Sequence, residues 1–371
     1  MNDSPRNFSR RRLFQSAAVT SVAVGLGGIA GATATSFGFG LGSLAVASVE
    51  GATECTPTPS PSPSPTPVPS TSKNLGAMVF VKQADFARDV AATVAAGFTW
   101  IRMDIPIGAY GAVTNGRFVP NAGMVTFYRQ AAAQASAAGL KIVLVMAAMY
   151  NSNTWSEAQF RDYNSQYVRS VSQSIGSFVD LWQVFNEHDG RDYRNHAPID
   201  LTSAYLARMR DTLAALRSAL RQYSTAPVTT TPFGYPVNQA RYDKWVKFFD
   251  GVGSSLDVIC VHAYPEKGQT TINLVPTYMT NLRNRYGKPV GILEFGLPSV
   301  TGYGTPTQVG AAVAAQIAAI MTCRPFVATL YQLRDRGVST TNGELVFGVL
   351  RNDWSKKSYY DAVATEVRKW R

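Results

Sequence analysis

The stretch WQVFNEHDG, residues 182–190, begins as a short apolar run and ends in polar residues. Its first four residues are too few for a helix and are rich in aromatic and β-branched types, which predicts a buried strand. Asn186 and Glu187 follow, so an amide and a carboxylic acid stand where the strand opens into a loop. One such pair carries little weight by itself, because the dipeptide is common by chance.

A second predicted strand gives this pair its weight. Residues 289–295, PVGILEF, form another short apolar run, and Glu294 stands at the corresponding place near its end. The two glutamates are 107 residues apart, which is roughly three strand-helix units with their loops. We therefore expect both carboxyl groups at the same edge of one parallel sheet.

Short apolar runs alternate with longer amphipathic ones from residue 73 onward. The predicted strands are residues 75–80, 100–105, 141–147, 181–185, 228–231, 258–262, 290–295 and 326–330. Helical segments between them include residues 84–96, 124–138, 157–175, 203–222 and 307–322. Eight strands with intervening helices predict an α/β fold, a (β/α)8 TIM barrel, whose functional groups lie at the carboxyl ends of the strands. The rival, an open doubly wound sheet, requires a Gly-rich loop after the first strand, where residues 82–85 are KQAD.

Residues 1–47 are predicted to be an export signal. A basic start, SRRRLFQ at residues 9–15, precedes a long, mildly apolar run, and residues 45–47 (AVA) offer a cleavage site. The paired arginines resemble a twin-arginine signal, although Leu13 precedes Phe14, the reverse of the usual order. The alternative is a retained membrane anchor, because the run is long enough to span a bilayer. We expect a secreted or cell-envelope protein, with a membrane partner only if the leader is retained.

Residues 48–72 are predicted to be a Pro/Ser/Thr-rich linker, and residues 73–371 a single domain. Alternating prolines fix φ and remove amide donors, which favours an extended, semi-rigid spacer. The three cysteines suggest no disulfide framework: Cys55 lies outside the domain, Cys260 in a predicted strand and Cys323 before the last one.

Composition and charge limit the classes of partner. The chain has 371 residues, of which 46% are hydrophobic and 11% aromatic, enough for one large core with appendages. Its net charge is +11, which could favour an anionic polysaccharide or a cell envelope. The simpler interpretation is a solvated basic surface, because the basic residues are scattered. No nucleic-acid motif accompanies them, so no nucleic-acid partner is expected.

With glutamates on the fourth and seventh predicted strands, residues 73–371 resemble the retaining glycoside hydrolases of clan A, nearest to families 5 and 39 of the cellulase-like superfamily. The matching residues lie on four predicted strands: Arg102, the pair Asn186 and Glu187, His262 with Tyr264, and Glu294. Residues 331–337 (YQLRDRG) and 347–360 (FGVLRNDWSKKSYY) resemble the closing segment of the clan. Two positions depart: Leu330 or Tyr331 stands where many relatives have tryptophan, and His188 instead of proline follows Glu187.

The resemblance implies a glycosidase that cleaves O-glycosidic bonds of a polysaccharide or oligosaccharide, expected to be β, by double displacement. Glu187 would be the acid/base and Glu294 the nucleophile, about 5–5.5 Å apart. Asn186 would bind the sugar 2-hydroxyl, while Arg102 and Tyr264 would support ionised Glu294. The remaining expected substrate-binding residues are His262, Tyr331 and Trp155.

No cofactor or metal is expected, and we expect a monomer. Aromatic residues after the predicted strands favour an open cleft and endo action: Tyr110, Tyr150, Trp155, Tyr193, Phe233, Tyr235 and Tyr303. Two other functions stay open: a transglycosylase on the same site, and a catalytically silent carbohydrate-binding barrel at the cell envelope. His262 could instead be a structural core histidine. A metal at His188, His196, Asp189 and Asp192 matches no tight ligand spacing.

Overall fold

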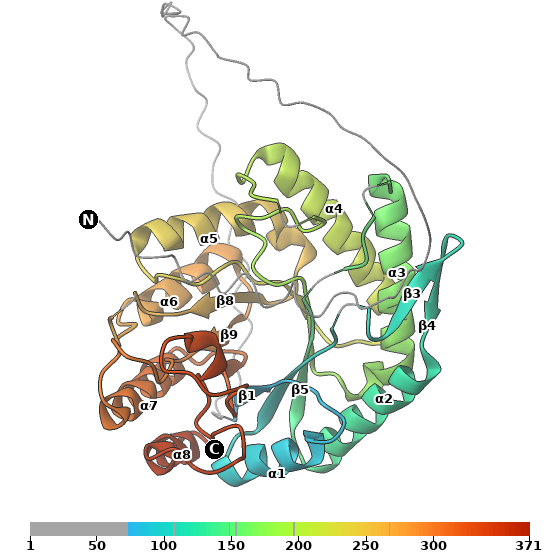
Figure 1. Ribbon diagram of the computed structural model, residues 1–371. Helices are drawn as coiled ribbons and strands as arrows, with labels where there is room; N and C mark the ends of the chain where they lie inside the picture. Colours follow the sequence, from blue (N-terminus) through green and yellow to red (C-terminus); the bar gives the residue numbers. More distant parts are fainter. Residues whose placement is uncertain (1–72, 107, 148, 153, 196, 267) are drawn as a thin grey trace, which may run out of the picture.

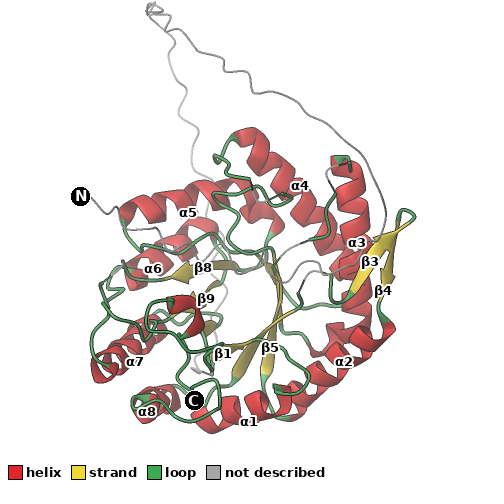
Figure 2. Cartoon of the chain, in the orientation of Figure 1, coloured by secondary structure: helices red, strands yellow, loops and turns green. Residues whose placement is uncertain are grey.

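The computed structural model describes residues 73–371 except residues 107, 148, 153, 196 and 267. The predicted export signal and linker lie outside these residues. Within them, parallel strands form a central barrel and helices surround it, as Figures 1 and 2 show. The predicted (β/α)8 TIM barrel is confirmed.

Eight strands make the barrel: β1 (Leu75–Val79), β2 (Trp100–Asp104), β5 (Lys141–Met146), β6 (Leu181–Val184), β7 (Val228–Thr229), β8 (Ile259–Ala263), β9 (Val290–Phe295) and β10 (Ala328–Leu330). Their order in the sheet is β7-β6-β5-β2-β1-β10-β9-β8. A backbone hydrogen bond from Asp257 N to Val228 O, 2.8 Å long, links the segment before β8 to β7. The two ends of the sheet therefore meet.

The helices that surround the barrel begin and end at recognisable signals. They are α1 (Phe86–Ala96), α2 (Ala122–Ala137), α3 (Glu157–Ile175), α4 (Ser203–Leu220), α5 (Gln239–Val252), α6 (Val275–Tyr286), α7 (Pro306–Thr322) and α8 (Tyr360–Lys369). Capping boxes at Ser156 and Thr305 satisfy free amides at the starts of α3 and α7. Gly97, with φ of 98°, ends α1 in the left-handed conformation that glycine adopts without strain.

Side chains inside the barrel form an apolar layer beneath a polar one. The apolar layer contains Trp100, Val143, Leu181, Val258, Cys260, Leu293 and Val327. Because side chains alternate along a strand, Arg102 points inward two residues after Trp100, while Ile101 between them packs in the outer core. Polar groups at the carboxyl ends of the strands therefore rest on an apolar, buried floor.

Strand β9 contains a bulge beside Glu294. Val261 and His262 of β8 pair with Ile292 and Glu294, so β9 has one extra residue at this point. The register of β9 against β10 shifts at the same place. Bulges re-aim side chains and are frequent next to functional sites. This one allows Glu294 to point into the barrel directly after the inward Leu293.

Two local features differ from the predicted elements. The fifth predicted strand, residues 228–231, ends at Thr229. An antiparallel hairpin, β3 (Gly111–Thr114) and β4 (Arg117–Pro120), was not predicted. It packs against α3, where Gln166 Oε1 accepts a 3.0 Å hydrogen bond from Phe118 N. Across the described ranges, no helix combines the length and the apolar character needed to cross a bilayer.

Candidate active site

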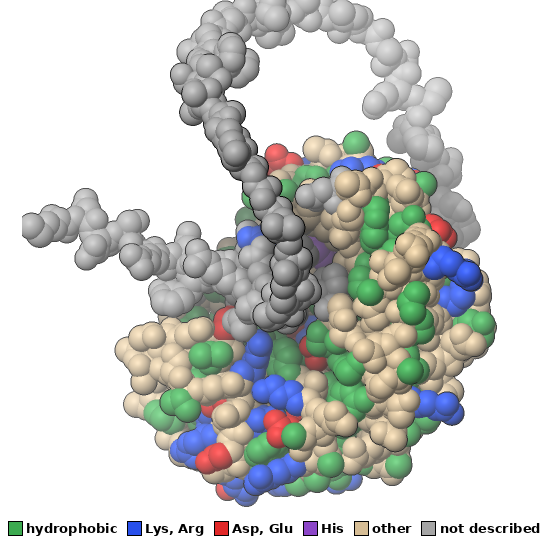
Figure 3. Space-filling view, turned by 45° about the vertical axis from the view of Figure 1, so that its right-hand side comes forward, with side chains coloured by type: hydrophobic (Ala, Val, Ile, Leu, Met, Phe, Trp, Pro, Cys, Tyr) green, Lys and Arg blue, Asp and Glu red, His purple; other side chains and the backbone are tan. Residues whose placement is uncertain are grey.

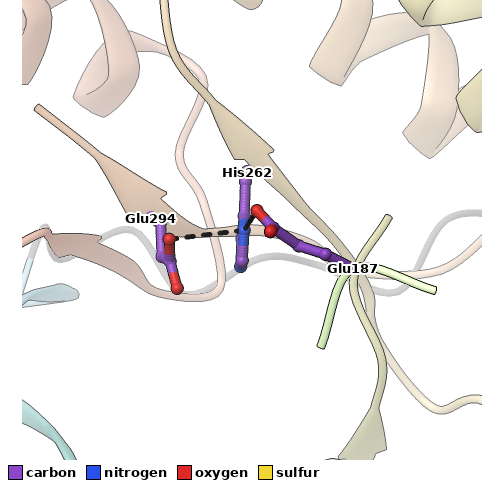
Figure 4. Close-up of side chains that lie close together, drawn as sticks. All are labelled: Glu187, His262 and Glu294. Atoms are coloured by element: carbon purple, nitrogen blue, oxygen red, sulfur yellow. Dashed lines mark hydrogen bonds and ion pairs between the residues drawn. The ribbon is translucent and has the colours of Figure 1, made fainter. Parts of the chain in front are cut away.

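Two glutamates and a histidine meet at the carboxyl ends of the strands. Glu187 lies after β6, Glu294 on β9 and His262 on β8, and Figure 4 shows His262 between the two carboxylates. His262 Nδ1 is 2.8 Å from Glu187 Oε1 and 3.5 Å from Glu294 Oε2. One ligand atom from each of the three side chains lies within 4.8 Å of the others. The two predicted glutamates are therefore neighbours across the barrel mouth.

The carboxylate of Glu294 accepts a hydrogen bond on each oxygen. Arg102 Nη1 donates to Oε1 and Tyr264 OH donates to Oε2, both at 2.8 Å. Arg102 is only 2% exposed and Glu294 6% exposed, so water screens their ion pair poorly. Both contacts stabilise the charged form of Glu294 and fix its orientation.

Gln183, which the sequence analysis missed, links Arg102 to Asn186. Its Oε1 accepts from Arg102 Nε at 2.9 Å, and its Nε2 donates to Asn186 Oδ1 at 2.8 Å. Asn186 Oδ1 also accepts from Arg102 Nη2 at 3.1 Å and from Thr231 Oγ1 at 3.4 Å. Three donors therefore hold the amide oxygen of Asn186 and leave its Nδ2 donors for a ligand.

The backbone that carries Glu187 adopts an unusual conformation. Phe185 and Glu187 have φ values of 66° and 61°, in the left-handed region that few non-glycine residues occupy. Neighbouring strands hold both residues there: Phe185 N donates to Met146 O at 3.0 Å and Glu187 N to Thr231 O at 2.8 Å. Such strained residues cluster at functional sites, where the surrounding structure supports them.

Aromatic side chains stand next to Glu294. The ring of Tyr331 lies 6.1 Å from Phe80 and 5.4 Å from Phe347, and Phe347 lies 6.0 Å from Tyr264, measured between centroids. The ring of Phe347 therefore lies between the predicted Tyr331 and Tyr264, the tyrosine that bonds Glu294. Phe347 comes from the long loop after β10. The sequence analysis did not name it as a site residue, because no periodic pattern marks its position. Figure 3 shows histidine atoms (purple) inside a hollow on this face.

Other aromatic residues named from the sequence lie elsewhere. Tyr110 and Tyr193 are 0% and 1% exposed, so both are core residues and cannot face a sugar. Trp155 packs edge-on against Tyr163 with 4.8 Å between ring centroids, just before α3. Its predicted contact with substrate stays a prediction.

The charged residues after Glu187 have structural partners. Asp189 is ion-paired with Arg241 at 3.0 Å and accepts from Phe233 N at 2.8 Å. His188 is 2% exposed and packs against the ring of Phe185. His196 lies outside the described residues. In the described part of the chain, the ligand atoms close enough for a metal ion are those of Glu187, His262 and Glu294.

Comparison with known proteins gives the family. The model of the glycosyl hydrolase catalytic core matches residues 130–341, more than half of the 371 residues. The chain is 23% identical over 204 residues to 1,3-beta-glucanosyltransferase GAS5 of Saccharomyces cerevisiae. That match covers 53% of this chain and 42% of the yeast protein, so the chain spans less than half of that relative's length.

Solved glycoside hydrolases share the fold. GH5_18 of Streptomyces cattleya, solved with GlcNAc, superposes with a TM-score of 0.65 at 16% identity, covering 81% of this chain and 80% of that one. A family 39 glycoside hydrolase from Bacteroides cellulosilyticus WH2 gives a TM-score of 0.59 at 18% identity, covering 81% and 65%. The family match and this shared fold confirm the resemblance to glycoside hydrolases of clan A. The chain belongs to the glycosyl hydrolase catalytic core family.

Proposed function

We propose that this protein is a secreted retaining glycosidase that cleaves β-glycosidic bonds of a polysaccharide by double displacement. The observation that carries the proposal is the spacing of Glu187 and Glu294, whose nearest ligand oxygens lie within 4.8 Å. Retaining enzymes hold their carboxyl groups about 5–5.5 Å apart, whereas inverting enzymes leave about 6.5–9.5 Å for a water. The short spacing supports direct attack on the sugar.

In the first step, Glu294 attacks the anomeric carbon while Glu187 gives its proton to the departing oxygen. The bond between sugar and aglycone breaks, and a glycosyl ester forms on Glu294. Arg102 and Tyr264 hold the attacking carboxylate at 2.8 Å each, which supports this role for Glu294. Asn186 Nδ2, which donates to no group among the described residues, would donate to the sugar 2-hydroxyl as charge develops at the anomeric centre.

In the second step, Glu187 acts as the base. It removes a proton from water, the water oxygen attacks the anomeric carbon, and the ester bond to Glu294 breaks. His262 Nδ1, 2.8 Å from Glu187 Oε1, would hold this carboxyl in place through both proton transfers. Two displacements restore the original anomeric configuration.

A second candidate is transglycosylation, in which a sugar hydroxyl replaces water in the second step. The observation that favours it is the match to a 1,3-beta-glucanosyltransferase, which covers 53% of this chain. The two reactions share the same glycosyl ester. Elongated products in the presence of excess oligosaccharide acceptor would identify transfer.

The experiment that tests the proposal follows the anomeric configuration of the first product by NMR. We expect retention, and a fluorinated activated glycoside should label Glu294 covalently. Glu294→Gln should abolish both labelling and turnover. Inverted product, or a label on Glu187, would show that the roles assigned to the two glutamates are wrong.

A further inference from the structure

Arg336, six residues beyond β10, presents an unused guanidinium beside the aromatic residues of the site. Its Cζ lies 4.2 Å from the ring centroid of Phe80, in a cation–π contact. Phe80 in turn packs edge-on against Tyr331. Within the described part of the chain, the Arg336 side chain forms no ion pair or hydrogen bond, so its N–H donors are available to a ligand.

A small hollow of about 20 Å³ next to Arg336 is lined by two cations that form no ion pair in the described structure. Its acidic lining residues already have partners: Asp89 pairs with Arg334 and Asp335 with Lys357, each at 2.8 Å. The other two charged residues of the lining, Lys82 and Arg336, make no ion pair in the described structure. The region therefore attracts anions.

Asp104, at the end of β2, lies within range of the positive charge of Arg336 but does not pair with it directly in the described structure. Its Oδ1 accepts a 3.3 Å hydrogen bond from Val81 N. Burial raises the pKa of this carboxyl overall, while the charges of Arg102 and Arg336 act in the opposite direction.

The order of the strands places Arg336 on one side of the cleavage point. In the closed ring, β10 is four strands from β6 in either direction, so it lies opposite the strand that carries Glu187. The proposed proton donor must contact the leaving-group oxygen, so the leaving group lies on the Glu187 side. The segment after β10 therefore faces the sugars on the other, non-reducing side.

We propose that Arg336, with Lys82, forms a subsite for an anionic substituent on a sugar at the non-reducing side of the cleaved bond. The natural substrate is then an acidic polysaccharide, an inference that rests on the proposed glycosidase function. A guanidinium held over an aromatic ring can donate two parallel hydrogen bonds to a carboxylate or a phosphate. The sugar ring itself would stack near Phe80 and Tyr331.

The test compares polysaccharides that differ only in charge. Uronic-acid-containing β-glycans are assayed beside their carboxyl-reduced forms, and phosphate-bearing glycans beside their dephosphorylated forms. We expect the parent to prefer one acidic polymer over its neutral counterpart by about 10- to 100-fold in kcat/KM, as for a hydrogen bond to a charged group. Added salt should reduce this preference.

Arg336→Gln should bring the ratio of acidic to neutral kcat/KM close to one, and Arg336→Lys should restore part of it. The matched control is Arg129→Gln, which removes the same charge from an exposed position on α2 and should keep the parental ratio. The polymer that the parent prefers shows whether the subsite binds a carboxylate or a phosphate. Equal cleavage of charged and neutral polymers, or an unchanged ratio in Arg336→Gln, would overturn the subsite but leave the glycosidase intact. If no glycan is cleaved at all, both proposals fall.

Discussion

Tyr264 contributes one of the two charge-assisted hydrogen bonds that hold Glu294. Tyr264→Phe removes only the donor that lies 2.8 Å from Oε2 and keeps the ring that packs against Phe347. We expect kcat to fall by about 10²–10³-fold with little change in substrate affinity, the scale seen when one donor to a developing charge is lost. Steady-state kinetics would measure both quantities.

The control for this variant is Tyr278→Phe. Tyr278 is a buried tyrosine on α6 whose hydroxyl donates to Gln239 Oε1, away from the glutamates. Its kcat should stay near the parental value. Full activity in Tyr264→Phe would remove the tyrosine from the mechanism, but the paired glutamates do not depend on it.

Gly234 leaves room for the backbone of His262. A Cβ at this position would lie 2.1 Å from His262 O, so even alanine must displace the strand that carries the histidine. We expect Gly234→Ala to lower kcat by about 10²-fold or more, because small displacements of a catalytic group cost rate on this scale. The control is Gly253→Ala, whose Cβ would make only an ordinary 3.7 Å contact with Ile259. Equal kcat values in the two variants would argue that the position of His262 is unimportant.

At the scale of elements, Asp257 joins α4 to the closing strands of the barrel. Its carboxylate pairs with Arg217 of α4 and with Arg221, the residue directly after that helix. It also accepts a hydrogen bond from Val228 N of β7 at 2.9 Å. Burial alone would raise the pKa of Asp257, but the hydrogen bonds from Arg217 and Val228 and the charges of both arginines lower it overall. A lowered pKa means that this contact stabilises the fold above the unfolded pKa of about 3.9 and is lost as the pH falls through the folded value.

Asp257→Asn should therefore reduce the free energy of unfolding by about 1 kcal/mol at pH 7, after allowance for screening of the partly exposed arginines. The difference between variant and parent should begin to shrink as the pH falls below about 3.9, where the carboxyl of the unfolded chain becomes protonated, and should vanish below the lowered pKa of the folded state. Urea unfolding of parent and variant at pH 7 and pH 3 would measure this difference in the free energy of unfolding. Asp250→Asn, which breaks the exposed pair with Arg285, is the control and should have little effect at either pH. A difference as large at pH 3 as at pH 7 would contradict an ionic origin.

Local sequence patterns predicted most elements of this fold, because apolar runs and capping residues act over a few positions. The hairpin β3–β4 also had such a signal: Asn115 and Gly116, with φ of 51° and 73°, form the Asn-Gly turn typical of hairpins. The bulge at Glu294 had no local sequence signal, because it depends on the register of β9 against both β8 and β10. Gln183 could have been recognised from the sequence, because it is a polar residue in an apolar strand, at a position whose side chain points into the barrel.

Sequence patterns could locate the residues of the candidate site that lie on strands or directly after them. Arg102, Glu187 and Glu294 come together because all parallel strands of a barrel end on one face. Phe347 and Arg336 lie on the long loop after β10, and a loop has no periodicity that would place its side chains. Resemblance marked this segment as the closing part of the domain, but only the folded chain places its side chains beside Phe80 and Tyr331.

At the scale of the whole molecule, we expect the domain to fold before it leaves the cytoplasm. Cys260 and Cys323 are buried free thiols, and burial raises the pKa of Cys260 to about 12, so it stays protonated and inert. A domain with no disulfide between these cysteines can fold in a reducing compartment. This agrees with the twin-arginine-like leader that we predict from the sequence, since that route carries proteins that are already folded.

Replacing Arg10, Arg11 and Arg12 together by lysine tests this route. The substitution keeps the positive charge of the leader, so a route that needs only a basic start should be unaffected, whereas recognition of paired arginines should fail. We expect glycosidase activity to stay inside the cells, measured by fractionation of the full chain. Arg6→Lys, outside the paired arginines, is the control and should be exported normally. Unchanged export of the triple variant would exclude the twin-arginine route and leave an ordinary signal peptide or a retained anchor as the leader's function.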